Sequence, residues 1–289
     1  MTRRFKLALL FLAPIALFAA LVGVDRAFGD APGRSRDYVV RMVLPPAGGE
    51  LGLPQVFGPA DASRPLVVID PGHGGHDPGA SIGSLKEKAL TLGLAEALRD
   101  RLIEQGGVRV ALTRDADHYL LLTERTGIAR RLHADLFVSI HADSSEAGNG
   151  RGATVYTLSD RGTSEVAQRL AIRENRADQI NGLRLTETSD AVSAILVDLS
   201  QRDSQARSEE FARLLLREGQ GKVAFHDKFV QSAAFAVLKS PDMPSVLFES
   251  GYINNPDDAE RLASRQGRAQ FAEFTAKAIR AYFARHSGP

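Results

Sequence analysis

From residue 66 onward, short continuous apolar runs alternate with longer segments of helical periodicity, and this alternation restricts the folds open to the chain. The first run, residues 66–69, is apolar at each position, which is typical of a strand buried on both faces of a sheet. Strands separated by helices predict a sheet covered by helices on both faces. We therefore expect a single α/β domain over residues 65–287, with a twisted, mostly parallel or mixed sheet of about six strands.

The same patterns predict where the elements lie. We expect strands over residues 66–69, 108–113, 135–140, 153–158, 234–238 and 245–248. Helices are expected over residues 85–105, 122–132 and 259–283, the last one broken near Gly267. Residues 159–225 interrupt the alternation, because they are mostly helical in pattern and more charged. We interpret them as a helical insertion.

The first 29 residues have the features of an export signal. Basic residues at positions 3, 4 and 6 precede an apolar stretch over residues 7–24, and small residues at 27 and 29 resemble a cleavage site. We expect a signal peptide over residues 1–29, a periplasmic protein, and a linker rich in Gly, Pro and Ala over residues 30–64. The alternative is an uncleaved membrane anchor, since eighteen such residues are about enough to span a bilayer.

Composition limits the chemistry further. The chain has no cysteine, so a metal ion would have to be held by His, Asp or Glu. The formal net charge is +1, which argues against nucleic acid as the main partner because phosphate binding usually needs a concentrated basic face.

Polar residues with metal-binding chemistry follow two of the expected strands. A glycine-rich loop over residues 70–79 carries His73 and His76, and Glu87 lies near the start of the next helix. His141 stands at the end of another apolar strand. Binding crevices form at strand ends in open α/β sheets, and a catalytic zinc ion normally keeps three protein ligands and one open position. His73, Glu87 and His141 fit such a site, although a lone histidine at a strand end is more often structural; His76 is expected to be a loop residue.

A carboxylate also stands where the strongly apolar run of residues 245–248 stops. Glu249 could be a surface acid or a helix cap, which is the commoner role of a glutamate. Beside a metal it could instead take a proton from the attacking water and pass it to a leaving amine. His226 precedes the polar run that starts at Gln231, and we expect it to be structural rather than a substrate contact.

Four motifs in order resemble the zinc-dependent type 3 N-acetylmuramoyl-L-alanine amidases, over about residues 66–285. They are the His73 loop ending in Asp-Pro-Gly, Glu87 before Lys88, His141 in Ser-Ile-His-Ala-Asp, and Glu249 in an apolar-Glu-x-Gly run that ends in Asn-Pro. The sequence is most similar to the periplasmic cell-separation amidases of Gram-negative bacteria. The resemblance implies that His73, Glu87 and His141 bind Zn²⁺ and that Glu249 is the catalytic carboxylate.

The resemblance also implies a reaction. It is hydrolysis of the amide between N-acetylmuramic acid and L-alanine in peptidoglycan, for wall remodelling and daughter-cell separation. Two alternatives stay open: a zinc peptidase that cuts within the stem peptide, and a non-catalytic wall-binding division protein. Several relatives carry a separate N-terminal wall-targeting domain, and residues 30–64 are too few to hold one.

Within the insertion, residues 190–200 have a helical pattern that is apolar over most of its surface. A helix this apolar must pack against something. Resemblance to the cell-separation amidases implies that it blocks the zinc cleft, with an acidic residue in the open zinc position. Glu187 is the first candidate for that residue and Glu174 the second. A LytM-domain activator would then displace the block. The alternative is an ordinary helical insertion that covers one side of the sheet and does not block the site.

Overall fold

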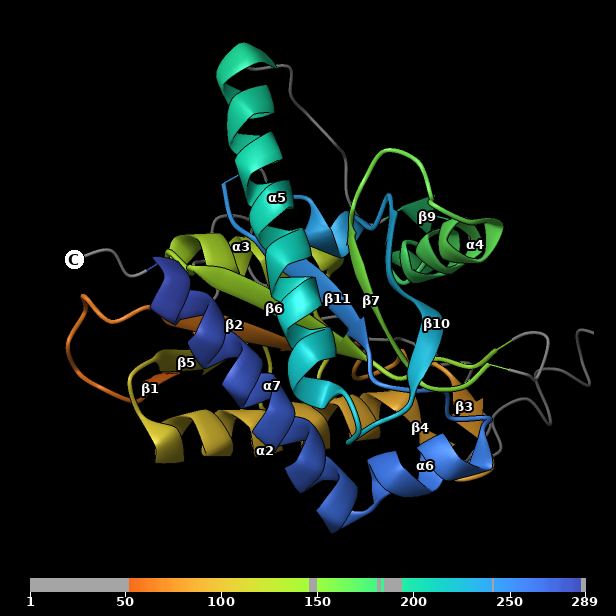
Figure 1. The fold of residues 1–289 in the computed structure, drawn as a ribbon. Coiled ribbons are helices and arrows are strands. Elements are labelled where there is room, and N and C mark those ends of the chain that lie inside the picture. The colour runs from red at the N-terminus through yellow and green to blue at the C-terminus, as the bar shows by residue number, and fades with distance from the viewer. Residues whose placement is uncertain (1–51, 146–149, 181–182, 185–193, 241, 287–289) are drawn as a thin grey trace, which may run out of the picture. The chain divides into compact units, whose positions relative to one another are not determined.

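Seven strands form one mixed sheet in a computed structural model of the chain (Figure 1). In order across the sheet they are β1 (Val56–Phe57), β5 (Arg109–Leu112), β2 (Leu66–Pro71), β6 (Leu136–His141), β11 (Ser245–Glu249), β7 (Ala153–Leu158) and β10 (Phe225–Ala233). The central strands β5, β2, β6 and β11 are mutually parallel, whereas β1 and β7 run antiparallel to their inner neighbours and β10 is parallel to β7.

The structure describes residues 52–145, 150–180, 183–184, 194–240 and 242–286, and for residues 179–200 it describes no side chain. The expected signal peptide and most of the expected linker lie outside these ranges. Within them, no helix combines the length and apolar character needed to cross a bilayer.

Helices cover both faces of the sheet, as predicted. The helices are α2 (Glu87–Gln105), α3 (Leu122–Arg131), α4 (Glu165–Glu174), α5 (Ala194–Gly219), α6 (Pro256–Ala263) and α7 (Arg265–His286). One hydrophobic cluster joins the sheet to α2, α5 and α7, and a second joins its other face to α3, α4 and the 3₁₀ turn η1 (Ala236–Leu238). Successive residues of one strand, such as Val67 and Val68, enter opposite clusters. This explains why the central strands are apolar at nearly every position.

Three details differ from the sequence-based expectation. Residues 234–238 do not form a strand, because their end forms η1, and the strand that precedes it is β10. Glu87 begins α2 directly, since residues 85–86 form β4 of a short hairpin with β3 (Ser81–Ile82). The terminal helical pattern breaks at Ser264, between α6 and α7, and Gly267 lies inside α7.

The insertion contributes to both faces of the sheet. It contains α4, the small hairpin β8 (Gln179–Ile180) and β9 (Leu183–Arg184), and the long helix α5. Leu170 of α4 packs in one hydrophobic cluster, whereas Phe211 of α5 packs in the other. Of the apolar segment 190–200, residues 194–200 begin α5 and the rest lies outside the described residues.

Candidate metal centre and active site

The connections of the sheet create a crevice at the ends of its central strands. From β2 the chain crosses through α2 to β5 on one side, and then returns through α3 to β6 on the other side of β2. Ligand sites of open α/β sheets lie where the strand order reverses in this way. His73 follows β2 by two residues, and His141 ends β6. Glu249 ends β11 directly opposite His141 in the register.

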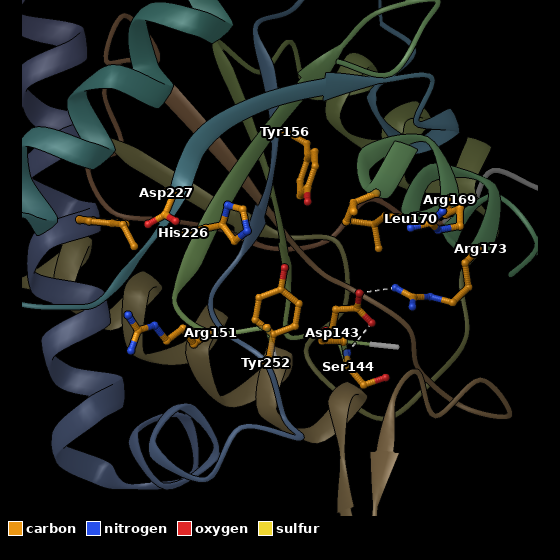
Figure 2. Close-up of a pocket in the computed structure, with 14 residues that line it drawn as sticks. Asp143, Ser144, Arg151, Tyr156, Arg169, Leu170, Arg173, His226, Asp227 and Tyr252 are labelled. Atoms are coloured by element: carbon orange, nitrogen blue, oxygen red, sulfur yellow. Dashed lines mark hydrogen bonds and ion pairs between the residues drawn. The ribbon is translucent and has the colours of Figure 1, made fainter. Parts of the chain in front are cut away.

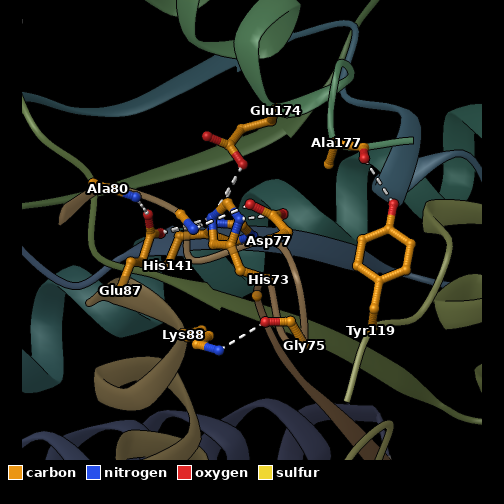
Figure 3. A network of polar contacts seen from close by, with 12 residues as sticks. His73, Gly75, Asp77, Ala80, Glu87, Lys88, Tyr119, His141, Glu174 and Ala177 are labelled. Carbon is orange, nitrogen blue, oxygen red and sulfur yellow. Dashed lines mark hydrogen bonds and ion pairs between the residues drawn. The ribbon is translucent and has the colours of Figure 1, made fainter. Parts of the chain in front are cut away.

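Four side chains converge at this crevice (Figure 3). Glu87 Oε1 lies 3.1 Å from His73 Nε2 and 3.1 Å from His141 Nδ1. Glu174 Oε2 lies 3.5 Å from each of the same two nitrogens. All four residues are buried. The structure therefore brings together the three residues predicted to bind metal and the second candidate for the blocking acid.

Further contacts fix the orientation of these ligands. Asp77 Oδ2 lies 2.8 Å from His73 Nδ1, which turns Nε2 towards the other ligands. Glu87 Oε2 accepts the backbone N–H of Ala80 at 2.8 Å, and its Oε1 accepts that of Ala142 at 2.9 Å. Such outer hydrogen bonds are typical of metal-binding histidines and carboxylates.

The crevice has no room for a side chain at Gly79. A Cβ atom there would lie 2.6 Å from both Glu87 Oε2 and His73 Cδ2, and the backbone φ of 64° is in the left-handed region. A residue with a side chain would therefore be strained and would push two ligands apart.

The donor set fits a divalent metal such as zinc. His73 Nε2 is buried and makes no hydrogen bond, although Glu87 Oε1 is close to it. Among the described residues, one set of possible metal-binding side chains has its donor atoms within 4.8 Å of one another: His73, His141 and Glu174. Glu87 Oε1 lies 3.1 Å from a nitrogen of each of the two histidines. Burial alone would lower the pKa of His73, but Glu87, Glu174 and Asp77 outweigh it and raise that pKa. The cluster is therefore one that favours a bound cation.

Two buried arginines hold the loop that carries His73. Arg114 donates to the carbonyl oxygens of Pro71 and Gly72, and Arg125 donates to those of Pro71 and His73. His73 itself has a φ of 59°, which is rare for a residue with a side chain. Each guanidinium donates to two backbone carbonyls of the loop. These hydrogen bonds hold the loop in a backbone conformation that would be strained without them.

A buried acid under the loop balances one of these arginines. Asp70 accepts hydrogen bonds from Arg125 at 2.9 Å, Ser139 at 2.7 Å and Thr113 at 2.6 Å. Burial by itself would raise the pKa of Asp70, but Arg125 and the two hydroxyls outweigh it and lower that pKa. The carboxylate is thus ionised and part of the support of the site.

Glu249 lies beside the cluster in a buried position. Its Oε2 accepts the backbone N–H of Asp143 at 3.0 Å, whereas Oε1 has no partner among the described residues. Burial raises the pKa of Glu249 well above its usual range, and the carboxylates of Asp143, Glu87 and Glu174 add to the shift. A buried carboxyl group with a free oxygen can accept and release a proton during a reaction.

Glu174 stands at the end of α4 and reaches the two histidines, whereas Glu187 lies outside the described residues. Its neighbour Arg173 pairs with Asp143, the residue that donates to Glu249. Burial raises the pKa of Asp143 to about 6, although Arg173 opposes the shift.

Two further histidines considered from the sequence, His76 and His226, do not join the cluster. His76 is exposed in the loop and stacks on Tyr119, with 4.2 Å between ring centroids, in agreement with a loop role. His226 is partly exposed in β10, accepts the N–H of Lys228, and lines a pocket next to Asp143.

Several site residues were not predicted from the sequence. Asp77 and Asp143 lie within the motifs, four residues after His73 and two after His141, so their spacing could have indicated them. Arg114 and Arg125 carry no such signal, because arginines in a helical or loop pattern are usually solvent-exposed.

Comparisons with known proteins identify the family of the chain. The family model described as N-acetylmuramoyl-L-alanine amidase matches residues 67–281. The chain is 38% identical over 221 residues to N-acetylmuramoyl-L-alanine amidase AmiA of Escherichia coli K12, which covers 75% of this chain and 76% of that protein. It is also 38% identical over 221 residues to AmiC of Neisseria meningitidis, which covers 76% of this chain and 53% of that protein.

A solved structure has the same fold. N-acetylmuramoyl-L-alanine amidase AmiC2 of Nostoc punctiforme matches with a TM-score of 0.55 and 32% identity, over 76% of this chain and 97% of that one. The family match covers well over half of the chain and contains His73, Glu87, His141 and Glu249. The chain belongs to the N-acetylmuramoyl-L-alanine amidase family, whose members hydrolyse the amide bond between N-acetylmuramic acid and L-alanine.

Proposed function

We propose that the chain cleaves this amide in peptidoglycan with a zinc ion held by His73, Glu87 and His141. The observation that carries the proposal is the convergence of His73 Nε2, His141 Nδ1 and Glu87 Oε1, with 3.1 Å between each nitrogen and the oxygen. When bound, zinc polarises the carbonyl of the amide and lowers the pKa of water towards about 7. A water-activating site of this kind suits hydrolysis of an unactivated amide.

Glu249 is the proton carrier in this proposal. Its Oε1, free of other partners in the described part of the chain, takes a proton from the attacking water and passes it to the nitrogen of L-alanine as the C–N bond breaks. The N–H of Asp143 holds the other oxygen, Oε2, and so orients the carboxyl group. Burial keeps the proton affinity of Glu249 high enough for both steps.

Glu174 blocks the same site in the proposed resting state. Its Oε2 is 3.5 Å from both histidine nitrogens, so it can take the position that water needs. A carboxylate is a good zinc ligand, and its displacement would open the site. The proposal replaces Glu187 by Glu174, the second candidate from the sequence, as the blocking residue.

Three side chains next to Glu174 hold it in place. Arg173 pairs with Asp143. The amide of Asn175 donates to Ala234 O at 2.8 Å and accepts the N–H of Ala236 at 2.7 Å, which ties the end of α4 to the segment before η1.

Asp178, which follows α4, makes the third contact, with the start of α3. Its carboxylate accepts the N–H of Leu122 at 3.0 Å and the hydroxyl of Tyr119 at 2.7 Å. Helix N-termini favour a carboxylate in this position. Because the three contacts reach three different segments, release of Glu174 requires the end of α4 to move as a unit.

A partner that binds the open form more tightly would drive this movement. We assign this role to an activator with a LytM domain, and we place the enzyme in the periplasm, where its substrate lies. The expected signal peptide over residues 1–29 and the similarity to the wall amidases AmiA and AmiC support this placement.

Metal analysis tests the proposal. The purified chain should hold about one zinc ion, chelation should abolish hydrolysis, and added zinc should restore it. His141→Ala should lose the metal, whereas His76→Ala, in the same crevice but outside the cluster, should keep it. Full hydrolysis by metal-free His141→Ala protein would rule out the zinc mechanism.

A further inference from the structure

A pocket of about 400 Å³ opens beside Asp143, the residue whose N–H binds Glu249 (Figure 2). This volume lies within the range of about 300–1,000 Å³ that is typical of ligand sites. Tyr156 of β7 and Tyr252 line it, and Figure 2 shows their rings entering from opposite sides with the hydroxyl groups directed inward. His73, Glu87 and His141 do not line this pocket, so it is a distinct space next to the proton carrier.

The Tyr156 hydroxyl is buried and has no hydrogen-bond partner within the described ranges. Native proteins leave few buried polar groups unpaired, because each unpaired group destabilises the fold. The other such atoms here are Glu249 Oε1, Ser250 Oγ and His73 Nε2 at the site, and the hydroxyls of Thr154 and Thr275. Four of these six atoms therefore lie at or next to the site, and the Tyr156 hydroxyl has a hydrogen bond to offer there.

The sheet register places Tyr156 and Glu249 on the same face. Leu247 lies opposite Tyr156, and Glu249 lies opposite Thr154 in the antiparallel pair of β11 and β7. Residues two apart on a strand share a face, so Tyr156 stands one step along the strands from the proton carrier. Burial raises the pKa of Tyr156, with added effects from Tyr252 and Glu249, so its hydroxyl stays protonated and can donate.

The position of the pocket relative to Glu249 indicates which part of the substrate would enter it. A proton carrier must lie within hydrogen-bond distance of the leaving nitrogen, which is the first atom of the stem peptide. The peptide therefore leaves the scissile bond on the Glu249 side. Arg151, Arg169 and Arg173 line the pocket together with Asp143 and Asp227; Arg173 pairs with Asp143, and Arg169 pairs with Glu165. A lining with several charged side chains suits the charged groups of a stem peptide better than the uncharged sugars of the glycan.

We propose that this pocket binds the stem peptide on the leaving-group side of the scissile amide, and that the Tyr156 hydroxyl donates to a carbonyl of that peptide. The proposal rests on the role given to Glu249 above. In this structure α4 covers the ring, since Leu170 and Ala171 share its hydrophobic cluster. Tyr156 thus becomes available to substrate when the end of α4 moves.

Tyr156→Phe tests the proposal in the full, zinc-loaded chain that also carries Glu174→Ala to open the site. With N-acetylmuramoyl-L-alanyl-D-glutamyl-diaminopimelate as substrate, kcat/KM should fall about three- to tenfold, the effect of one neutral hydrogen bond. Binding of the free tripeptide, measured by calorimetry, should weaken by a similar factor. The melting temperature should stay the same or rise, because the hydroxyl removed has no protein partner.

Thr275→Val is the matched control, since it removes another buried, unpaired hydroxyl from α7. It should leave kcat/KM and tripeptide binding unchanged. Equal kcat/KM and equal tripeptide binding with and without the Tyr156 hydroxyl would overturn the proposal. The proposal would also be overturned if both values fell and the melting temperature of Tyr156→Phe fell with them, because the hydroxyl would then stabilise the fold. A parent chain that cleaves no muramoyl amide would instead contradict the proposed function, and tripeptide binding would still test the pocket.

Discussion

At the scale of single residues, the site depends on buried charges that hold its loop rather than on the metal ligands alone. Asp70 and Arg125 form an ion pair with both side chains at most 3% exposed, and Arg125 also binds three backbone carbonyls. Breaking a buried pair on one side leaves the other charge uncompensated, which typically costs about 3–5 kcal/mol. The loop that presents His73 should therefore be sensitive to a change at Asp70, which belongs to the support of the site and not to the cluster itself.

We predict that Asp70→Asn lowers the free energy of unfolding at pH 7 by about 3–5 kcal/mol, measured by chemical denaturation. Asp242→Asn is the control, because Asp242 pairs with Arg130 on the surface at 3.4 Å and should cost under about 1 kcal/mol. Since the pKa of Asp70 is lowered in the folded state, its stabilisation is present above the unfolded value of about 3.9 and is lost as the pH falls further. The difference between wild type and variant should thus shrink below about pH 4; a difference that grows there would contradict the assignment.

Asp77 would act on the proposed zinc ion through His73, because its carboxylate lies 2.8 Å from His73 Nδ1. We predict that Asp77→Asn weakens zinc affinity about 10- to 100-fold, while leaving the enzyme active once it is saturated with zinc. Competition with a chelator of known affinity measures this, and Asp115→Asn at an exposed position of the neighbouring loop serves as the control. Unchanged zinc affinity would mean that Asp77 only shapes the loop.

At the scale of elements, the end of α4 is the part that the proposed opening must move. Asn175 binds Ala236 of η1 and Asp178 binds the start of α3, while Glu174, which directly precedes Asn175, lies 3.5 Å from His73 and His141. Loss of these side-chain contacts removes interactions made only in the closed state, so it should shift the population towards the open form.

We predict that Asn175→Ala together with Asp178→Ala raises basal hydrolysis of peptidoglycan by more than about tenfold, with zinc content unchanged. Each lost hydrogen bond is worth about 1 kcal/mol, or about fivefold in the open population. Arg176→Ala, an exposed residue between the two, is the control and should have no effect. A doubly substituted chain that stays folded and is no faster than wild type would show that these contacts do not keep the site closed.

The strands also show which elements can be predicted from the sequence pattern. The strands β2, β5, β6, β7 and β11 were predicted because burial on both faces makes them continuously apolar. The edge strand β10 was missed, since several of its residues are exposed and its sequence is largely polar. The apolar run after it was taken for a strand, but it packs as a 3₁₀ turn against α3. Edge strands lack the periodic burial that makes central strands recognisable.

At the scale of the whole molecule, the insertion is part of the core and also reaches the site. Phe211, Leu214 and Leu215 of α5 are buried in one cluster, and α4 contributes to the other. Removing residues 159–225 would therefore expose two apolar surfaces. His73, Glu87 and His141 could be predicted to lie together because strand ends converge in this fold, whereas the position of Glu174 beside them depends on how the insertion folds back, which no local pattern specifies.

The proposed location of the enzyme gives a prediction for the whole chain. Expression in a Gram-negative host should yield periplasmic protein whose N-terminus lies near residue 30, as N-terminal sequencing would reveal. Replacing the basic residues at positions 3, 4 and 6 should reduce export. Mature protein that begins at Met1 would instead favour an uncleaved anchor.

The bond that the enzyme cuts is the central claim, and mass spectrometry of the products tests it most directly. Zinc-loaded protein carrying Glu174→Ala should release from purified sacculi intact stem peptides that begin with free L-alanine, and leave glycan strands with free lactyl groups. The same protein with Glu249→Gln should keep its zinc and release at most a small fraction of these peptides, since a neutral amide cannot accept the proton. Peptides cut within the stem, with L-alanine still attached to the glycan, would contradict the account.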